Sequence, residues 1–229
     1  MKRRQFTSGL VSSWPLTGLL ACDLVRAAGF SEFDASQAVR AALERGAMAA
    51  IASLGQADGF LGNPKVRIPL PGFLNDAAKL LKLTGQQRQV DELVTAMNRG
   101  AEAAMPMAKD LFVRTIAAMS VDDALKIVRG SDTAVTEFFA RKTRVPLGEQ
   151  FLPIVTQATN KVALAERFNA VAGKAAKLGL LKGEDANIQR YVTAKALDGL
   201  YLMVGEEERK IRRDPLATGS AILRKVFGG

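Results

Sequence analysis

The fold is decided by residues 86–116, which read QQRQVDELVTAMNRGAEAAMPMAKDLFVRTI. Apolar side chains recur through this stretch at steps of three and four residues, the spacing that places them on one face of an α-helix. Pro106 lies inside the stretch, and because proline cannot donate the helical hydrogen bond, we expect a kink or a break there. The stretch predicts a long amphipathic helical segment whose apolar positions are Val90, Leu93, Val94, Met97, Ala101, Ala104, Ala108, Leu111, Phe112 and Ile116.

Helical spacing continues on both sides of this segment, and no sustained two-residue alternation indicates a sheet. Capping boxes at 34–37 and 120–123 predict two helix starts, and residues 131–132 predict a third. Asp214 and Pro215 have the form of an N-cap and a first helical residue. The expected helices cover about 35–54, 73–83, a short piece closed at Gly130, 132–142, 151–162, 164–178, 183–213 and a last helix after Pro215.

These elements are joined by short connections, which favour one domain over two. The predicted fold class is therefore all-α, a single multi-helix bundle-like domain covering residues 28–229. One long Pro/Gly-rich loop is expected after the first helix, at residues 56–72, where three prolines and three glycines exclude a helix interior.

That loop carries the residues that we single out as candidate ligand-binding residues. Lys65 and Arg67 alternate with Val66 and Ile68, so an extended run would separate basic from apolar side chains. Together with Asn63, and with Arg99 on the long helix, these basic groups could bind an anion or a carboxylate. The alternative is a rigid loop whose charges are simply solvated.

The first 27 residues have the composition of an export signal. A basic start is followed by sixteen uncharged residues from Thr7 to Cys22, which are too few and too polar for a membrane span. Arg3, Arg4 and Phe6 resemble the twin-arginine type of signal. Leu19 to Cys22 resembles a lipobox, which would lipidate Cys22, while residues 25–27 offer a competing cleavage site.

Export would make the protein periplasmic, or membrane-anchored on the outer side of the inner membrane through the leader or a lipidated Cys22. Removal of residues 1–27 takes away four basic residues and one acidic residue, which leaves +6 of the formal charge of +9. An excess of six charges, without a basic cluster interleaved with aromatics, argues against nucleic acid as a partner.

The chain contains no histidine and one cysteine. Ser-His-Asp and Cys-His catalysis and His-ligated metals are therefore excluded, as are an intrachain disulfide and a Cys-ligated cluster. No phosphate-binding or dinucleotide-binding motif is present, so we expect no cofactor and no metal.

Two other groups of polar residues could form either a functional site or an ordinary solvent-exposed helix surface. Asp91, Glu92, Asn98, Arg99 and Glu102 could assemble a carboxylate site, but a solvated helix face is the favoured prediction. For residues 206–213, EEERKIRR, a self-paired and exposed helix end is favoured over a metal or nucleic-acid site.

Four blocks of the sequence resemble a family of exported bacterial proteins catalogued as domain of unknown function 4197. They are GFLGNPKVRIPLPG at 59–72, VDEL with MNRGAE between 90 and 102, FLPIV at 151–155, and KALDGLY with EEERKIR between 195 and 212. The resemblance implies an exported helical domain and supplies no activity, cofactor or catalytic residue.

The function expected from the sequence is that of a non-catalytic helical binding or interaction protein of the cell envelope. Its partner would be an envelope protein or an anionic ligand. Two alternatives are kept: a protein that binds an anionic surface, either lipid or a polyanion, and a His-independent hydrolase that uses carboxylates.

Overall fold

The computed structural model describes residues 30–177 and 187–228, with side chains for all of these except 174–177. The predicted export signal, with Arg3, Arg4, Phe6 and Cys22, lies outside the described residues. Within them the chain is helical and has no strand, which confirms the all-α prediction. The helices are α1 Glu32–Leu54, α2 Asn75–Leu83, α3 Gln87–Met107, α4 Lys109–Ala118, α5 Ala124–Val128, α6 Ala134–Asn160, α7 Leu164–Lys177, α8 Ile188–Arg213 and α9 Ala221–Phe227, with 3₁₀ turns η1 Gly72–Leu74 and η2 Leu216–Thr218.

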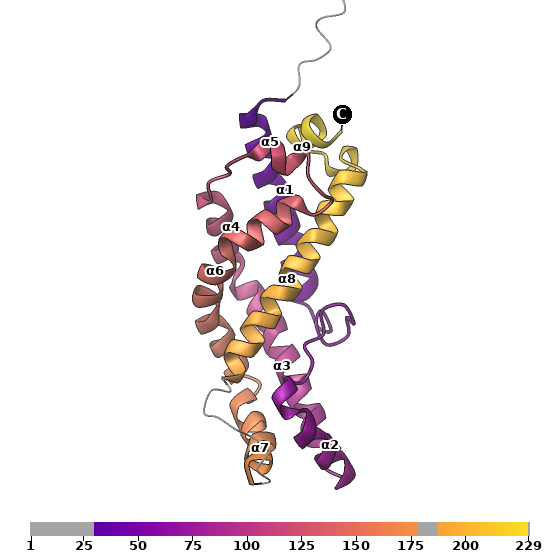
Figure 1. The fold of residues 1–229 in the computed structure, drawn as a ribbon, viewed down its shortest axis with the longest axis vertical. Coiled ribbons are helices and arrows are strands. Elements are labelled where there is room, and N and C mark those ends of the chain that lie inside the picture. Colours follow the sequence, from indigo (N-terminus) through magenta and orange to yellow (C-terminus); the bar gives the residue numbers. More distant parts are fainter. Residues whose placement is uncertain (1–29, 178–186, 229) are drawn as a thin grey trace, which may run out of the picture.

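The helices form an elongated bundle with α1 and α8 along its long axis (Figure 1). α2 and α7 lie at one end, and α5 and α9 lie at the other (Figure 1). The helix α8 packs against both α1 and α6, while α3 packs against α6 and α7. Among the described helices, none is long and apolar enough to span a membrane.

Small residues let α1 and α8 approach closely. A Cβ atom added at Gly46 of α1 would lie 3.2 Å from Cγ1 of Val204 of α8. Aromatic pairs fill the space around α6: Phe151 packs edge-on against Phe112, and Phe139 packs edge-on against Tyr201, each at a centroid distance of 5.7 Å. The core therefore lies along the α1–α8 and α6–α8 contacts.

The break predicted near Pro106 is present. The helix α3 ends at Met107 and α4 begins at Lys109. The amide of Ala108 still bonds to the carbonyls of Ala104 and Met105, so the last turn of α3 is complete before α4 begins.

The prediction of two separate helices at 132–142 and 151–162 is wrong. α6 is one helix of 27 residues that contains both Pro146 and Pro153. Each proline removes one backbone hydrogen bond, but apolar burial on both sides holds the helix together. The buried residues around the prolines are Phe139, Leu147, Phe151 and Val155.

Three helix starts also differ from the predictions. α1 is capped by Ser31, whose side chain accepts from the amide of Asp34 in a capping box three residues earlier than expected. No capping box opens α5; instead Glu32 of α1 accepts from the first two amides of α5. The predicted α8 start at 183–185 lies outside the described residues, and the described helix begins at Ile188 with Asn187 as its side-chain cap.

At the C-terminus, Asp214 caps the short turn η2 rather than a helix. Its Oδ1 accepts from the amide of Ala217 at 3.0 Å. α9 begins later, at Ala221, with Ser220 as its side-chain cap. Gly219 has a φ of 69°, which turns the chain between these two elements.

The α1 cap predicts an acid dependence of stability. The Lys225 ammonium and the Ser31 backbone and hydroxyl donors lower the pKa of the Asp34 carboxyl from 3.8 to about 2. Because the folded-state pKa lies below the unfolded value, the bonds contribute stability above about pH 4 and lose it as the pH falls toward 2. Asp34→Asn should therefore lower the melting temperature at pH 7, and the difference from the wild type should shrink in scans taken below pH 4.

Candidate functional site

The loop of residues 55–71, here called the Pro/Gly loop, is bound by a carboxylate of α3. Glu102 is only 4% exposed, and its Oε1 accepts from the amides of Phe60 at 3.0 Å and Leu61 at 2.9 Å. Its Oε2 pairs with Nη1 of Arg99 at 2.7 Å. A buried carboxylate with three donors is satisfied, so Glu102 fixes the start of the loop to α3.

One turn earlier, Asn98 binds the other end of the loop. It is fully buried, its Oδ1 accepts from the amide of Ile68 at 2.8 Å, and its Nδ2 donates to the carbonyl of the same residue at 2.9 Å. Asn98 therefore pairs with Ile68 as a neighbouring strand would. The predicted solvated face is wrong for Asn98 and Glu102, because this side of α3 is covered by the loop.

Apolar side chains seat the same loop against α8. Phe60, Val66 and Ile68 are buried, whereas Lys65 and Arg67 are exposed. The Tyr191 hydroxyl of α8 donates to the carbonyl of Pro69 at 3.0 Å, and burial raises the pKa of this tyrosine.

Gly199 of α8 provides the space for Phe60. A Cβ atom at Gly199 would lie 2.8 Å from Cε1 of Phe60 and 3.3 Å from Cβ of Val66. Gly199→Ala should therefore destabilise the protein by about 1–3 kcal/mol despite its better helix propensity. Gly173→Ala in α7 is the matched control, because its Cβ would meet no atom within 4 Å, and it should stabilise by about 0.5–1 kcal/mol. Urea unfolding of both variants measures the difference, and equal effects would contradict this packing argument.

Each candidate ligand-binding residue has a partner within the chain. Nζ of Lys65 lies 3.5 Å from Oε1 of Glu206, although the Lys65 side chain is 60% exposed. Nη1 of Arg67 donates to the carbonyl of Leu61 at 2.9 Å, and Oδ1 of Asn63 accepts from the amide of Lys65. Asn63 and Arg67 therefore bond within the loop, and Lys65 contacts α8.

Arg99 connects the loop to a neighbouring cavity. Its Nη2 pairs with Oδ1 of Asp58 at 2.8 Å, and Asp58 has a φ of 64°, a conformation that few non-glycine residues adopt. The Glu102 carboxylate, followed by that of Asp58, raises the pKa of Arg99. The guanidinium group is therefore a fixed cation at the border between the Pro/Gly loop and the cavity.

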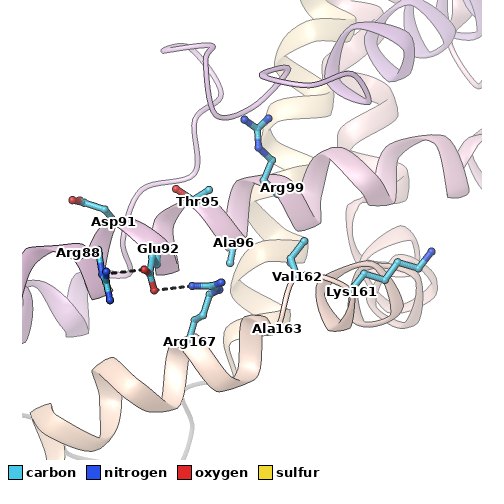
Figure 2. A pocket seen from close by; sticks show the side chains of 10 residues that line it. All are labelled: Arg88, Asp91, Glu92, Thr95, Ala96, Arg99, Lys161, Val162, Ala163 and Arg167. Atoms are coloured by element: carbon cyan, nitrogen blue, oxygen red, sulfur yellow. Dashed lines mark hydrogen bonds and ion pairs between the residues drawn. The ribbon is translucent and has the colours of Figure 1, made fainter.

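The cavity, here called the arginine pocket, lies between α3 and the corner where α6 meets α7 and has a volume of about 490 Å³. One face of α3 forms the first wall, and Arg167 of α7 stands on the opposite wall (Figure 2). Ala163 turns the α6–α7 corner with a φ of 51°. The pocket is lined by Arg88, Asp91, Glu92, Thr95, Ala96, Arg99, Lys161, Val162, Ala163 and Arg167.

Two arginines meet on one carboxylate inside this pocket. Nη1 of Arg167 lies 2.8 Å from Oε2 of Glu92, and Nε of Arg88 lies 3.4 Å from Oε1 of the same group (Figure 2). Four basic and two acidic side chains line the pocket, and one of the basic ones, Arg99, is paired with Asp58 and Glu102 from outside the lining. The guanidinium groups of Arg88 and Arg167 offer donors that match a carboxylate or phosphate.

Arg99 is a candidate ligand-binding residue predicted from the sequence, whereas the pocket residues Arg88, Lys161 and Arg167 were not predicted. The spacing of Arg88 and Glu92 by four residues indicates an ion pair on one helix. Arg167 is 75 residues from Glu92, and no local pattern shows that α7 packs against α3.

The fold and this site define an all-α protein with an internally bonded Pro/Gly loop beside an open pocket whose lining has four basic and two acidic side chains. The chain belongs to the family described as Protein of unknown function (DUF4197), which it matches over residues 29–228. A search of curated proteins and a search of solved structures each gave no match.

Proposed function

We propose that the protein is an exported, non-catalytic binding protein of the cell envelope and that it holds a small anionic molecule in the arginine pocket. The observation that carries the proposal is Arg167, which stands on the wall opposite α3 beside an open space of about 490 Å³ and meets Arg88 on the Glu92 carboxylate. This volume is within the range of small-molecule sites.

The buried bonds of the Pro/Gly loop support binding at this place. Asn98 and Glu102 are polar groups that would be costly to bury unless fully bonded, and their partners are backbone groups of one loop. The Glu102 carboxylate also orients Arg99 at the border of the arginine pocket. A side chain that is held before binding loses less conformational entropy when a ligand arrives.

The arrangement of the carboxylates favours binding over hydrolysis. Asp91 and Glu92 are adjacent on α3, while Arg167 and Lys161 lie on the α6–α7 side of the pocket. A two-carboxylate hydrolase needs its acids on either side of the scissile bond. Placement outside the cytoplasm is part of the proposal, and it rests on the basic and uncharged segments of residues 1–27.

The proposal predicts that small anions stabilise the mature protein. At a concentration of 100 Kd, an anion should add about 2.7 kcal/mol, which raises the melting temperature of a domain of this size by about 5 °C or more. Thermal scans with phosphate, sulfate, citrate and succinate at constant ionic strength measure the effect, and neutral succinamide is the control molecule.

Arg167→Gln should abolish most of that shift, because it removes the donor on the α7 wall. An equal shift in this variant would place the anion elsewhere. Binding to anionic vesicles without any response to small anions would favour surface binding, and chemical conversion of an added compound would favour an enzyme.

A further inference from the structure

The Glu92 side chain lies between two arginines that line the arginine pocket. Its two oxygens are divided between two helices: Oε2 faces Arg167 of α7, and Oε1 faces Arg88 of its own helix (Figure 2). Each oxygen of Glu92 thus lies against a different guanidinium group, and the carboxylate of a dissolved molecule could make the same charge-assisted contacts.

The two contacts of Glu92 differ in strength. The Arg167 contact is short, at 2.8 Å, and the Arg167 side chain is 39% exposed. The Arg88 contact is 3.4 Å, and that side chain is 89% exposed, so solvent and salt screen it more. Because both contacts are open to water, each can exchange for a contact with a dissolved anion.

We propose that Glu92 is a built-in competitor for the pocket and that the molecule bound there carries a carboxylate, which displaces Glu92 from Arg167. This inference rests on the proposed function, because it names the group recognised at the same site. Binding exchanges the ion pair between Glu92 and Arg167 for an ion pair between the ligand and Arg167, so no covalent bond is made or broken. Thr95 and Arg99, on the next turns of the same α3 face, line the space into which the rest of the molecule extends.

The competition predicts that removing the Glu92 charge strengthens binding. Glu92→Gln frees Arg167 and leaves the pocket one charge more positive, so the affinity for succinate should rise by about fivefold or more. Isothermal titration of the mature protein with succinate measures the effect. Inorganic phosphate is the second probe, and a larger gain for phosphate than for succinate would overturn the assignment of a carboxylate.

Glu166→Gln is the matched control, because it removes an equal charge one residue before Arg167 while Glu166 does not line the arginine pocket. It should change succinate affinity less than twofold, by long-range electrostatics alone. Arg167→Gln should weaken succinate binding by about tenfold or more, since a hydrogen bond to a charged group is lost.

The outcomes separate the two proposals. If succinate and phosphate bind the wild type and Glu92→Gln equally well, the competitor role is wrong and the binding function stands. If neither probe binds either protein, both proposals fail. If Glu92→Gln gains no affinity and is also less stable than Glu166→Gln, Glu92 serves only to hold α7 against α3.

Discussion

Replacing Glu208 with alanine should lower the free energy of unfolding by about 3–5 kcal/mol, the largest effect we expect from a single substitution. Glu208 lies on α8 and is only 2% exposed. Its carboxylate accepts from the amides of Val135 and Thr136 at 3.0 and 2.8 Å, and from the Thr136 hydroxyl at 2.7 Å. It therefore caps the N-terminus of α6 from another helix, where the helix dipole favours a negative charge.

The same carboxylate neutralises Arg212, which is nearly buried. Nη2 of Arg212 lies 2.9 Å from Oε1 of Glu208, and its Nη1 donates to the carbonyl of Val128 at 2.7 Å. Glu208→Ala would leave a cation without its partner and two amides without acceptors, which is why the cost exceeds that of an ordinary ion pair.

Glu207→Ala is the control for this prediction. Glu207 precedes Glu208 on the same helix and pairs with Lys210, whose side chain is 69% exposed. Its removal should cost at most about 1 kcal/mol. Urea unfolding of both variants gives the two free energies, and a loss below about 1 kcal/mol for Glu208→Ala would show that the cap is dispensable.

Replacing Glu102 with alanine should cost about 2–4 kcal/mol and should free the Pro/Gly loop. The change leaves the Phe60 and Leu61 amides without their acceptor and removes the partner that orients Arg99. Amide hydrogen exchange should rise across the loop while the α1–α8 contact stays protected, because local opening does not require global unfolding.

Glu149→Ala is the control, since it removes an exposed glutamate from the middle of α6 and should change stability by at most about 0.5 kcal/mol. Glu102→Gln keeps an acceptor oxygen at the same place, so it should restore part of the loop protection. Unchanged exchange at Phe60 and Leu61 in Glu102→Ala would contradict the role assigned to this carboxylate.

Local sequence patterns predicted much of the helical framework. The apolar spacing of 86–116 predicted α3, α4 and the break between them because the side chains that decide it are neighbours along the chain. The spacing failed at α6, because the penalty of Pro146 and Pro153 is local, whereas the burial that compensates for it comes from other helices.

The roles of the buried polar residues could not be predicted in this way. Residues 206–213 were expected to be an exposed and self-paired helix end, and this is wrong for Glu208. The pairing of Glu208 with Arg212 follows from their spacing. The α6 amides that donate hydrogen bonds to Glu208, however, lie more than 70 residues away in the chain. The same holds for Asn98 and Glu102, whose partners in the Pro/Gly loop precede them by 30 to 42 residues.

The arginine pocket combines both situations. Arg88, Glu92 and Arg99 share a face of α3 by simple helical geometry, so their proximity is predictable. Arg167 reaches Glu92 only because α7 folds back along α3 through the corner at Ala163. The ligand-binding hypothesis therefore moves from the exposed loop residues Lys65 and Arg67 to the pocket that Arg99 borders.

Native mass spectrometry of the mature protein purified from its own cell envelope tests the central claim most directly. We predict a small acidic molecule retained without covalent change on the wild-type protein and absent from Arg167→Gln. A wild-type protein that carries no small molecule, or one that retains the same molecule equally after Arg167→Gln, would contradict binding in the arginine pocket.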